Sequence, residues 1–466
     1  MPNGIARSLR NSSTNTVTCK NGRPSSMTGP FGWDFKLCAI WLNPSTIQRI
    51  QSPILLTKQN MRILTSTFVL GLTLSLFAAD WPQWRGPNRD GVNLEKGLAA
   101  EWPEGGPKLL YKATGVGAGF SSVVIADDTV YTLGDLEDAC YLFALDLKGK
   151  HKWKSRIGEP KGHRGYPGPR STPTVANGHV YALGQQGDLV CVSTEGKEVW
   201  RVNIQNDYEG RMMSGWRWSE SPLVDDDKVV VTPGGDKGAV LALDAKTGKQ
   251  VWRCEGLTDP AGYSSLIIRE IGDIKQYIQL TGKSVAGIDA GNGKLLWRAD
   301  RPGKTAVIST PIYDKGTLFV TSAYGVGCNG FKVEYKNNQF VANEIYKHVG
   351  GAGMANHHGG AIRVGDYVYG SNSGQLSCLR LSDGEVMWNE QSAGKGAIIV
   401  ADNKIILRTE RGPVSLVKLS PTGYEEVSRF DQPERTRARA WAHPVVLNGK
   451  LYLRDQDNMF VYDISR

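Results

Sequence analysis

Arginine, lysine, histidine and tryptophan residues recur in segments that each lead into a short apolar run. Arginine binds carboxylate or phosphate through paired hydrogen bonds, and aromatic rings stack on flat groups. If these segments meet in the fold, they predict a concave site for an anionic or planar ligand. The candidate residues are Arg170, Arg211, Trp216, Arg217, Trp218, Glu220, His357, His358, Lys395, Arg437, Trp441 and His443.

The same residues have a purely structural alternative. Arginine and tryptophan side chains in loops often pack on one another through cation–π contacts. Trp216 and Trp218 would then fill the centre of the fold without binding anything.

The adjacent pair His357-His358 raises the question of a metal site. Neighbouring residues of an extended chain point in opposite directions, and the sequence offers no obvious third ligand. The chain also has no Cys-x-x-Cys pair, no Gly-x-Ser-x-Gly motif and no phosphate-binding loop ahead of a helix. We therefore predict no metal and no catalytic residue. A hydrolase or lyase that acts on a saccharide through either histidine is an alternative.

Between residues 149 and 388, a glycine stands four residues ahead of a tryptophan at five places. The pairs are Gly149 and Trp153, Gly196 and Trp200, Gly248 and Trp252, Gly293 and Trp297, and Gly384 and Trp388. The spacings between successive tryptophans are 47, 52, 45 and 91 residues, and the last splits into 49 and 42 if Tyr346 takes the missing place. A repeat of roughly 40–50 residues built from short strands predicts a β-propeller.

Each repeat contains four apolar runs bounded by glycine, aspartate and asparagine, which is the pattern of a four-stranded blade. Two of the turns carry Asn-Gly, at Asn177 and Asn448, and this pair suits a tight hairpin with positive φ at both central residues. Seven complete repeats cover residues 121–157, 171–204, 220–254, 264–299, 309–348, 359–389 and 396–430.

The two ends of the repeat array complement one another. The last repeat, which begins at Pro444, has three strands, and residues 108–112 copy a fourth strand but have no strands before them. We predict that this front segment completes the last blade, because closing the ring removes exposed strand edges. The predicted fold is an all-β, eight-bladed β-propeller over residues 107–466, with an extension, residues 80–106, that packs on it.

The front of the chain differs from the rest in charge and composition. Residues 1–79 hold eight Lys or Arg residues and one Asp, whereas residues 80–466 hold 47 basic and 45 acidic residues. The formal charge of +9 therefore lies mostly in the front segment, and we expect no nucleic-acid-binding surface.

Residues 61–79 join a basic start, an apolar run and two small residues, Ala78 and Ala79, which is typical of a signal peptide. The run is short for a transmembrane helix, so we expect a periplasmic or secreted monomer without a stable membrane anchor. Residues 1–60 show no periodicity, and we expect them to be disordered or not translated in the natural product. A signal anchor with a disordered cytoplasmic tail is the alternative.

The exported part contains an odd number of cysteines, so at least one is unpaired within a single chain. They are Cys140, Cys191, Cys254, Cys328 and Cys378. Two of them, Cys191 and Cys378, align with Ala144 and Ala242 of other repeats, which predicts small buried side chains rather than disulfides.

The repeats resemble the pyrroloquinoline quinone (PQQ) type repeat, whose Ala-x-Asp-x-x-x-Gly-x-x-x-Trp core is matched at Ala242, Asp244, Gly248 and Trp252. The segment Trp81–Gly91 also resembles the start of secreted bacterial PQQ-like propellers. The resemblance implies an eight-bladed propeller outside the cytoplasm. It also implies structural roles for the tryptophan, which docks between blades, and for the glycine, which forms the turn.

The members of the family that this chain resembles fall into two classes. Some are dehydrogenases that bind PQQ and Ca²⁺ over the central channel, and others, similar to the outer-membrane assembly protein BamB, are scaffolds without a cofactor. The dehydrogenases carry adjacent cysteines, and this chain has no Cys-Cys pair. Glu220 and Asn356 lie in suitable loops for a calcium site, but the residues around them do not match.

From these features we expect a non-catalytic binding scaffold with no cofactor. Its expected partner is a protein or envelope component, with an anionic ligand possible at the channel mouth. The alternative is a PQQ-dependent dehydrogenase.

Overall fold

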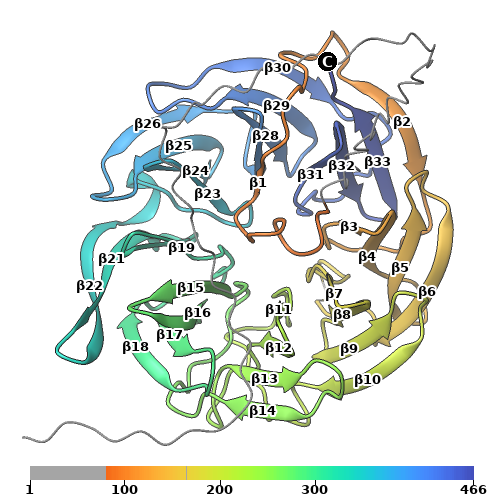
Figure 1. The fold of residues 1–466 in the computed structure, drawn as a ribbon. Helices are drawn as coiled ribbons and strands as arrows, with labels where there is room; N and C mark the ends of the chain where they lie inside the picture. Colours follow the sequence, from red (N-terminus) through yellow and green to blue (C-terminus); the bar gives the residue numbers. More distant parts are fainter. Residues whose placement is uncertain (1–79, 164) are drawn as a thin grey trace, which may run out of the picture. The chain divides into compact units, whose positions relative to one another are not determined.

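The computed structural model describes residues 80–163 and 165–466, so the predictions for residues 1–79 lie outside the described part. The described residues form eight antiparallel sheets arranged as blades around a centre (Figure 1). In the first seven blades the four strands of each repeat run in chain order from the centre to the rim, and in the eighth blade the strand from the front of the chain lies at the rim. The predicted all-β, eight-bladed propeller of four-stranded blades is confirmed.

The first blade consists of β3 (Val124–Ala126), β4 (Thr129–Asp135), β5 (Cys140–Asp146) and β6 (His151–Gly158), and the second of β7 (Thr174–Ala176), β8 (His179–Leu183), β9 (Asp188–Ser193) and β10 (Glu198–Asn203). The third consists of β11 (Leu223–Asp225), β12 (Lys228–Val231), β13 (Leu241–Asp244) and β14 (Gln250–Arg253), and the fourth of β15 (Ile267–Ile271), β16 (Ile274–Leu280), β17 (Ser284–Asp289) and β18 (Leu295–Asp300). The fifth blade consists of β19 (Ile312–Asp314), β20 (Thr317–Ser322), β21 (Gly327–Lys336) and β22 (Gln339–His348). The sixth consists of β23 (Ala361–Val364), β24 (Tyr367–Asn372), β25 (Gln375–Arg380) and β26 (Val386–Gln391). The seventh consists of β27 (Gly396–Ala401), β28 (Lys404–Thr409), β29 (Pro413–Lys418) and β30 (Glu426–Asp431).

The eighth blade joins the two ends of the propeller. It consists of β31 (Val445–Leu447), β32 (Lys450–Asp455) and β33 (Asn458–Asp463), and β2 (Lys108–Ala113) pairs antiparallel with β33 as its fourth strand. The predicted closure by the front strand is therefore confirmed. In the described part of the chain the one helix, the 3-10 turn η1 (Gly350–Ala352), is far too short to span a bilayer.

The repeated tryptophan of one blade packs on the turn glycine of the next. A Cβ built on Gly196 would lie 2.7 Å from the Trp153 ring, and a Cβ on Gly248 would lie 2.8 Å from the Trp200 ring. Both glycines also have positive φ, at +89° and +70°, so the turn and the close approach each require glycine. The Trp153 Nε1 donates to the carbonyl of Thr194 in the same turn at 2.9 Å, which satisfies the partly buried indole.

Two positions adapt this contact. Tyr346 takes the tryptophan position, as the spacing suggested: its ring faces Gly384, and its hydroxyl donates to the Leu381 carbonyl at 3.0 Å. Trp297 instead donates to Gln276 Oε1 of its own blade at 2.8 Å. The following blade ends in the ten-residue strands β21 and β22, so its outer hairpin is longer than those of the other blades.

The apolar core lies between the blades rather than within one of them. Each cluster of buried apolar side chains joins neighbouring blades, as Leu142 of β5 and Val190 of β9 do. The five cysteines of the described residues are all buried and unpaired, and Cys191 and Cys378 pair across the ladder with Trp200 and Trp388. The two predicted Asn-Gly hairpins have positive φ at both central residues.

The segment that precedes β2 crosses the inner strands of several blades. Its short strand β1 (Val92–Asn93) pairs parallel with β27, and the backbone of Trp81 pairs with that of Ile125 in the first blade. Arg85 donates to the Ala361 carbonyl at 2.5 Å, and Arg89 donates to the Ser221 carbonyl at 2.9 Å. The segment thus satisfies carbonyl groups on inner strand edges that have no neighbouring strand.

Replacing Gly248 by alanine tests the contact between blades. The new Cβ meets the Trp200 ring and sits at positive φ, so we expect a loss of roughly 2–4 kcal/mol in the free energy of unfolding. The matched control is Gly178→Ala, which has a similar φ of +73° but nothing within 4 Å of the new Cβ, and should cost about 1 kcal/mol. Urea unfolding measures both, and equal losses would contradict the proposed role of the tryptophan contact.

Candidate functional site

A cavity of about 280 Å³ lies at the mouth of the central channel, where the loops that lead into the inner strands converge. The loops ahead of the inner strands of all eight blades contribute to its lining, so the lining residues come from parts of the chain that are far apart in the sequence. Seven of the twelve predicted site residues line it: Arg170, Trp216, His357, His358, Lys395, Trp441 and His443.

The other five predicted residues lie elsewhere. Arg211 is exposed and pairs with Asp236 at 2.9 Å, and Arg437 is exposed on the loop that leads into β31. Arg217 does not line the cavity and has a positive φ of +67°. Trp218 is buried in the apolar cluster between the second and third blades, so it fills that cluster instead of the channel mouth.

Glu220 is buried below the cavity rather than exposed to it. Its carboxylate accepts hydrogen bonds from the Thr232 amide and from Gln279 Nε2, the latter at 3.3 Å. Burial raises the pKa of Glu220 to about 7. The residue therefore links the ends of the second strands of the third and fourth blades and does not line the cavity.

Sequence reasoning missed two charged residues of the cavity, Arg439 and Glu410. Arg439 lies two positions after the predicted Arg437 in the same irregular loop, and of the two it is Arg439 that lines the cavity. Glu410 lies in the turn between β28 and β29, a kind of loop that the search for residues ahead of inner strands did not include. The aromatic lining also includes Trp84 from the N-terminal segment, whose Nε1 donates to Thr310 Oγ1 at 3.0 Å.

Aromatic rings from separate blades form one side of the cavity. His163 stacks on Trp216 with ring centroids 3.8 Å apart and planes 5° apart. Tyr166 and Phe120 both pack on Trp441, with centroid distances of 4.8 and 4.7 Å. These contacts hold large flat surfaces in fixed positions beside the cavity.

Arg170 lies among these rings as a largely desolvated cation. Its guanidinium is 5.3 Å from the Phe120 ring centroid and 5.6 Å from that of Trp216. Its hydrogen-bond acceptors in the described structure are backbone carbonyls, with Tyr166 the nearest at 2.6 Å. Burial lowers the pKa of Arg170 to about 10, so it remains a cation at neutral pH.

Glu410 connects several polar side chains of the cavity lining. Its carboxylate accepts hydrogen bonds from Trp441 Nε1 at 3.0 Å and from Arg439 at 3.2 Å. Lys395 Nζ lies 3.4 Å from the same carboxylate, and His358 Nε2 lies 3.6 Å from it.

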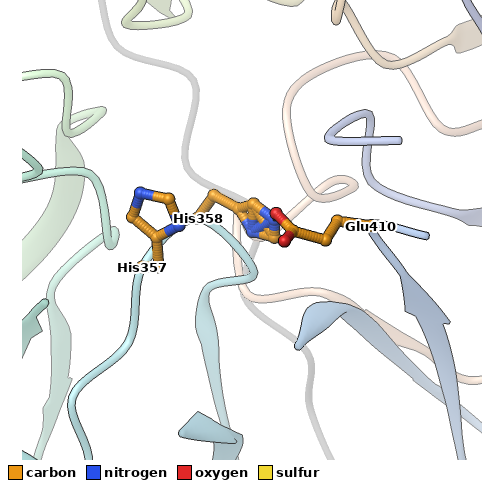
Figure 2. Close-up of side chains that lie close together, drawn as sticks. All are labelled: His357, His358 and Glu410. Carbon is orange, nitrogen blue, oxygen red and sulfur yellow. The ribbon is translucent and has the colours of Figure 1, made fainter. Parts of the chain in front are cut away.

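The two adjacent histidines lie side by side, which corrects the expectation that they point apart. Their rings stack with centroids 5.1 Å apart and planes 20° apart, and the His358 ring lies next to the Glu410 carboxylate (Figure 2). The chain here has no strand geometry, since both residues precede β23 in an irregular loop. Glu410 supplies a third group that could hold a metal and that the sequence did not reveal, because one ligand atom from each of the three residues lies within 4.8 Å of the others.

Burial keeps the imidazoles around the cavity neutral. It lowers the pKa of His357 to about 4, with Lys395 adding to the effect, and that of His443 to about 3, with Arg85 adding. The pKa of His358 is lowered well below its usual range, first by burial and then by His357. At neutral pH the positive charge of the cavity therefore comes from its arginine and lysine side chains.

The sequence profile described as outer membrane protein assembly factor BamB matches residues 141–390, more than half of the chain. The chain belongs to this PQQ-like β-propeller family. The resemblance expected from the repeats is thereby confirmed.

Individual relatives cover smaller parts of the sequence. Tetrathionate hydrolase of Acidithiobacillus ferrooxidans is 29% identical over 201 residues, which are 38% of this chain and 37% of that protein. BamB of Kangiella koreensis is 27% identical over 231 residues, 47% of this chain and 50% of that protein. The chain thus spans half or less of the length of these two curated relatives.

Among solved structures, the quinohemoprotein alcohol dehydrogenase from Comamonas testosteroni superposes with a TM-score of 0.54 and 13% identity, over 83% of this chain and 80% of that chain. At this identity the likeness shows a shared fold.

The residues of the cavity do not fit a calcium-bound quinone. Calcium takes six to eight oxygen ligands, whereas Glu410 is the one carboxylate among the described residues of the lining. Its oxygens already accept hydrogen bonds from Trp441 and Arg439. The donor set of the cavity therefore favours imidazole-binding metals or direct contact with an anion over calcium.

The buried imidazole of His443 predicts a pH-dependent stability. Because its pKa is about 3 when folded and near 6.5 when unfolded, the unfolded state binds one more proton between these values. The free energy of unfolding should then fall by about 1.4 kcal/mol per pH unit from this group as the pH drops below 6.5. In urea titrations at pH 4 to 7, His443→Gln should show a correspondingly shallower decrease, whereas parallel curves would contradict the assignment.

Proposed function

We propose that this chain is a binding protein of the cell envelope that holds a small anion with a flat or apolar body at the mouth of its central channel. The observation that supports this function best is the convergence of three cations, Arg170, Lys395 and Arg439, with tryptophan rings around a cavity that contains one carboxylate.

The charge of the cavity supports an anionic ligand. Glu410 pairs with Lys395 and Arg439, and Arg170 has backbone carbonyls for partners. With neutral histidines, the cavity carries an excess of positive charge in a desolvated setting. A buried charge is costly unless an opposite charge pairs with it, so an anion that enters the cavity relieves this cost.

The aromatic lining supports a flat or apolar body for that ligand. Trp84, Trp216 and Trp441 all line a cavity of about 280 Å³, close to the lower end of typical ligand pockets. Most of the lining is apolar, with a few converging polar groups to orient the ligand, which is the usual composition of a small-molecule site.

The relatives are compatible with this proposal and extend it. The name of tetrathionate hydrolase denotes an enzyme for a small anion, although its similarity covers 38% of this chain. The BamB relatives are named for outer-membrane protein assembly, which favours a second candidate, docking of an envelope protein. A signal peptide at residues 61–79 and a periplasmic or secreted location remain part of the proposal.

The alternative of a PQQ-dependent dehydrogenase rests on the shared propeller fold. The poor fit of the cavity to calcium argues against it. PQQ without calcium belongs to the proposed ligand class as a planar carboxylate, so it is included among the test ligands.

A pair of neighbouring arginines provides the test. Isothermal titration of the full chain with phthalate, tetrathionate, sulfate and PQQ should reveal binding of at least one anion. Arg439→Gln should weaken that binding at least about tenfold, because a hydrogen bond to a charged group contributes roughly 1.5–3 kcal/mol. Arg437→Gln, two residues away on the same loop but outside the cavity, should bind as the wild type does.

The proposal fails if none of these anions binds the folded protein at millimolar concentration. It also fails if Arg437→Gln loses as much affinity as Arg439→Gln, because the effect would then be a general loss of surface charge. In either case protein docking becomes the better account.

A further inference from the structure

We propose that His357, His358 and Glu410 form a binding site for a divalent transition-metal ion of the zinc type, at the edge of the cavity. This site lies in the same cavity as the proposed anion site but does not depend on it, because its ligands are imidazole and carboxylate groups rather than the arginine and lysine side chains. The three residues come from two loops, the one ahead of β23 and the turn between β28 and β29.

The arrangement of the three side chains is close to that of a metal site. Their ligand atoms lie within 4.8 Å of one another, and His358 Nε2 is 3.6 Å from Glu410 Oε2. Two ligands of one tetrahedral zinc ion lie about 3.3 Å apart, given bonds of about 2.0–2.1 Å. Side-chain rotations, including a change in the stacked imidazole planes, would bring the three ligands onto one ion. Figure 2 shows how the three side chains lie in the structure.

His358 has an unsatisfied polar side chain that points to a missing ligand. It is 7% exposed, and neither ring nitrogen has a hydrogen-bond partner in the described structure. Buried polar atoms nearly always have a partner, because an unpaired one costs about 1–3 kcal/mol. A metal ion on Nε2 would satisfy this nitrogen where no protein group does.

The surroundings of the three ligands support the same assignment. Trp441 and Arg439 hold the Glu410 carboxylate in place by hydrogen bonds, as outer partners of metal ligands usually do. Burial keeps both imidazoles in the neutral form that binds metals. Two imidazoles and one carboxylate suit zinc or ferrous iron, and three protein ligands leave a position open to water or an anion.

Lys395 is the competitor for this site. Its Nζ lies 3.0 Å from His357 Nδ1 and 3.4 Å from the Glu410 carboxylate, so it places a positive charge where the metal charge would be. A metal ion must displace this ammonium, which its flexible four-carbon stem permits. Removing the charge should therefore tighten metal binding, which distinguishes this site from a random cluster of polar residues.

The test uses the untagged full chain, stripped with a chelator and free of added anions. Zn²⁺ is titrated calorimetrically, and Co²⁺ is followed by its visible absorption, which reports coordination by nitrogen and oxygen ligands. We expect one equivalent to bind the wild type, Lys395→Met to bind at least tenfold more tightly, and Glu410→Gln and His358→Ala to bind at least tenfold more weakly. His151→Gln, at an exposed histidine of β6, is the matched control and should bind as the wild type does.

The inference is overturned if neither the wild type nor Lys395→Met binds one equivalent of Zn²⁺ or Co²⁺. It is also overturned if Lys395→Met binds no more tightly than the wild type. Because that variant is expected to gain affinity, misfolding cannot imitate the result. Anion titrations of the same metal-free protein test the proposed function separately.

Discussion

The packing of an aromatic ring on the turn glycine of the next blade is the contact on which this propeller depends. Several of these rings pack on a glycine at positive φ in the turn of the next blade, as Trp153 does on Gly196, and the Trp153 indole also donates to a carbonyl of that turn. Around the ring closure Tyr111 of β2 packs in the same way on Gly149 of the first blade. The front strand thus completes both the last sheet and the circle of contacts between blades.

This circle explains how residues far apart in the sequence reach one cavity. The blades fix the direction of each loop ahead of an inner strand, so Arg170, Lys395 and Trp441 meet although they lie in three different blades. The N-terminal segment satisfies free carbonyls of the inner strands, as Arg85 does for Ala361, and contributes Trp84 to the lining. The fold therefore builds a site from loops that are individually short.

The sequence was sufficient to predict the architecture, because the repeat length follows directly from the packing of one blade on the next. The spacing of glycine and tryptophan predicted the blades and the substitution by Tyr346. The missing fourth strand of the last repeat predicted the closure by residues 108–112. It was insufficient for the site, because a period locates loops but not the direction of single side chains. Arg437 and Arg439 are indistinguishable in sequence, Glu410 lies in a turn without a repeat signal, and the stacking of His357 on His358 depends on an irregular backbone.

The most direct measurement of the central claim is a crystal structure of the protein soaked with p-bromobenzoate, with the bromine located by its anomalous scattering. The account predicts one strong bromine peak inside the cavity, between the rings of Trp216 and Trp441, with the carboxylate in contact with a cation of the lining. An empty cavity at saturating ligand, or bromine peaks confined to the outer surface, would contradict it.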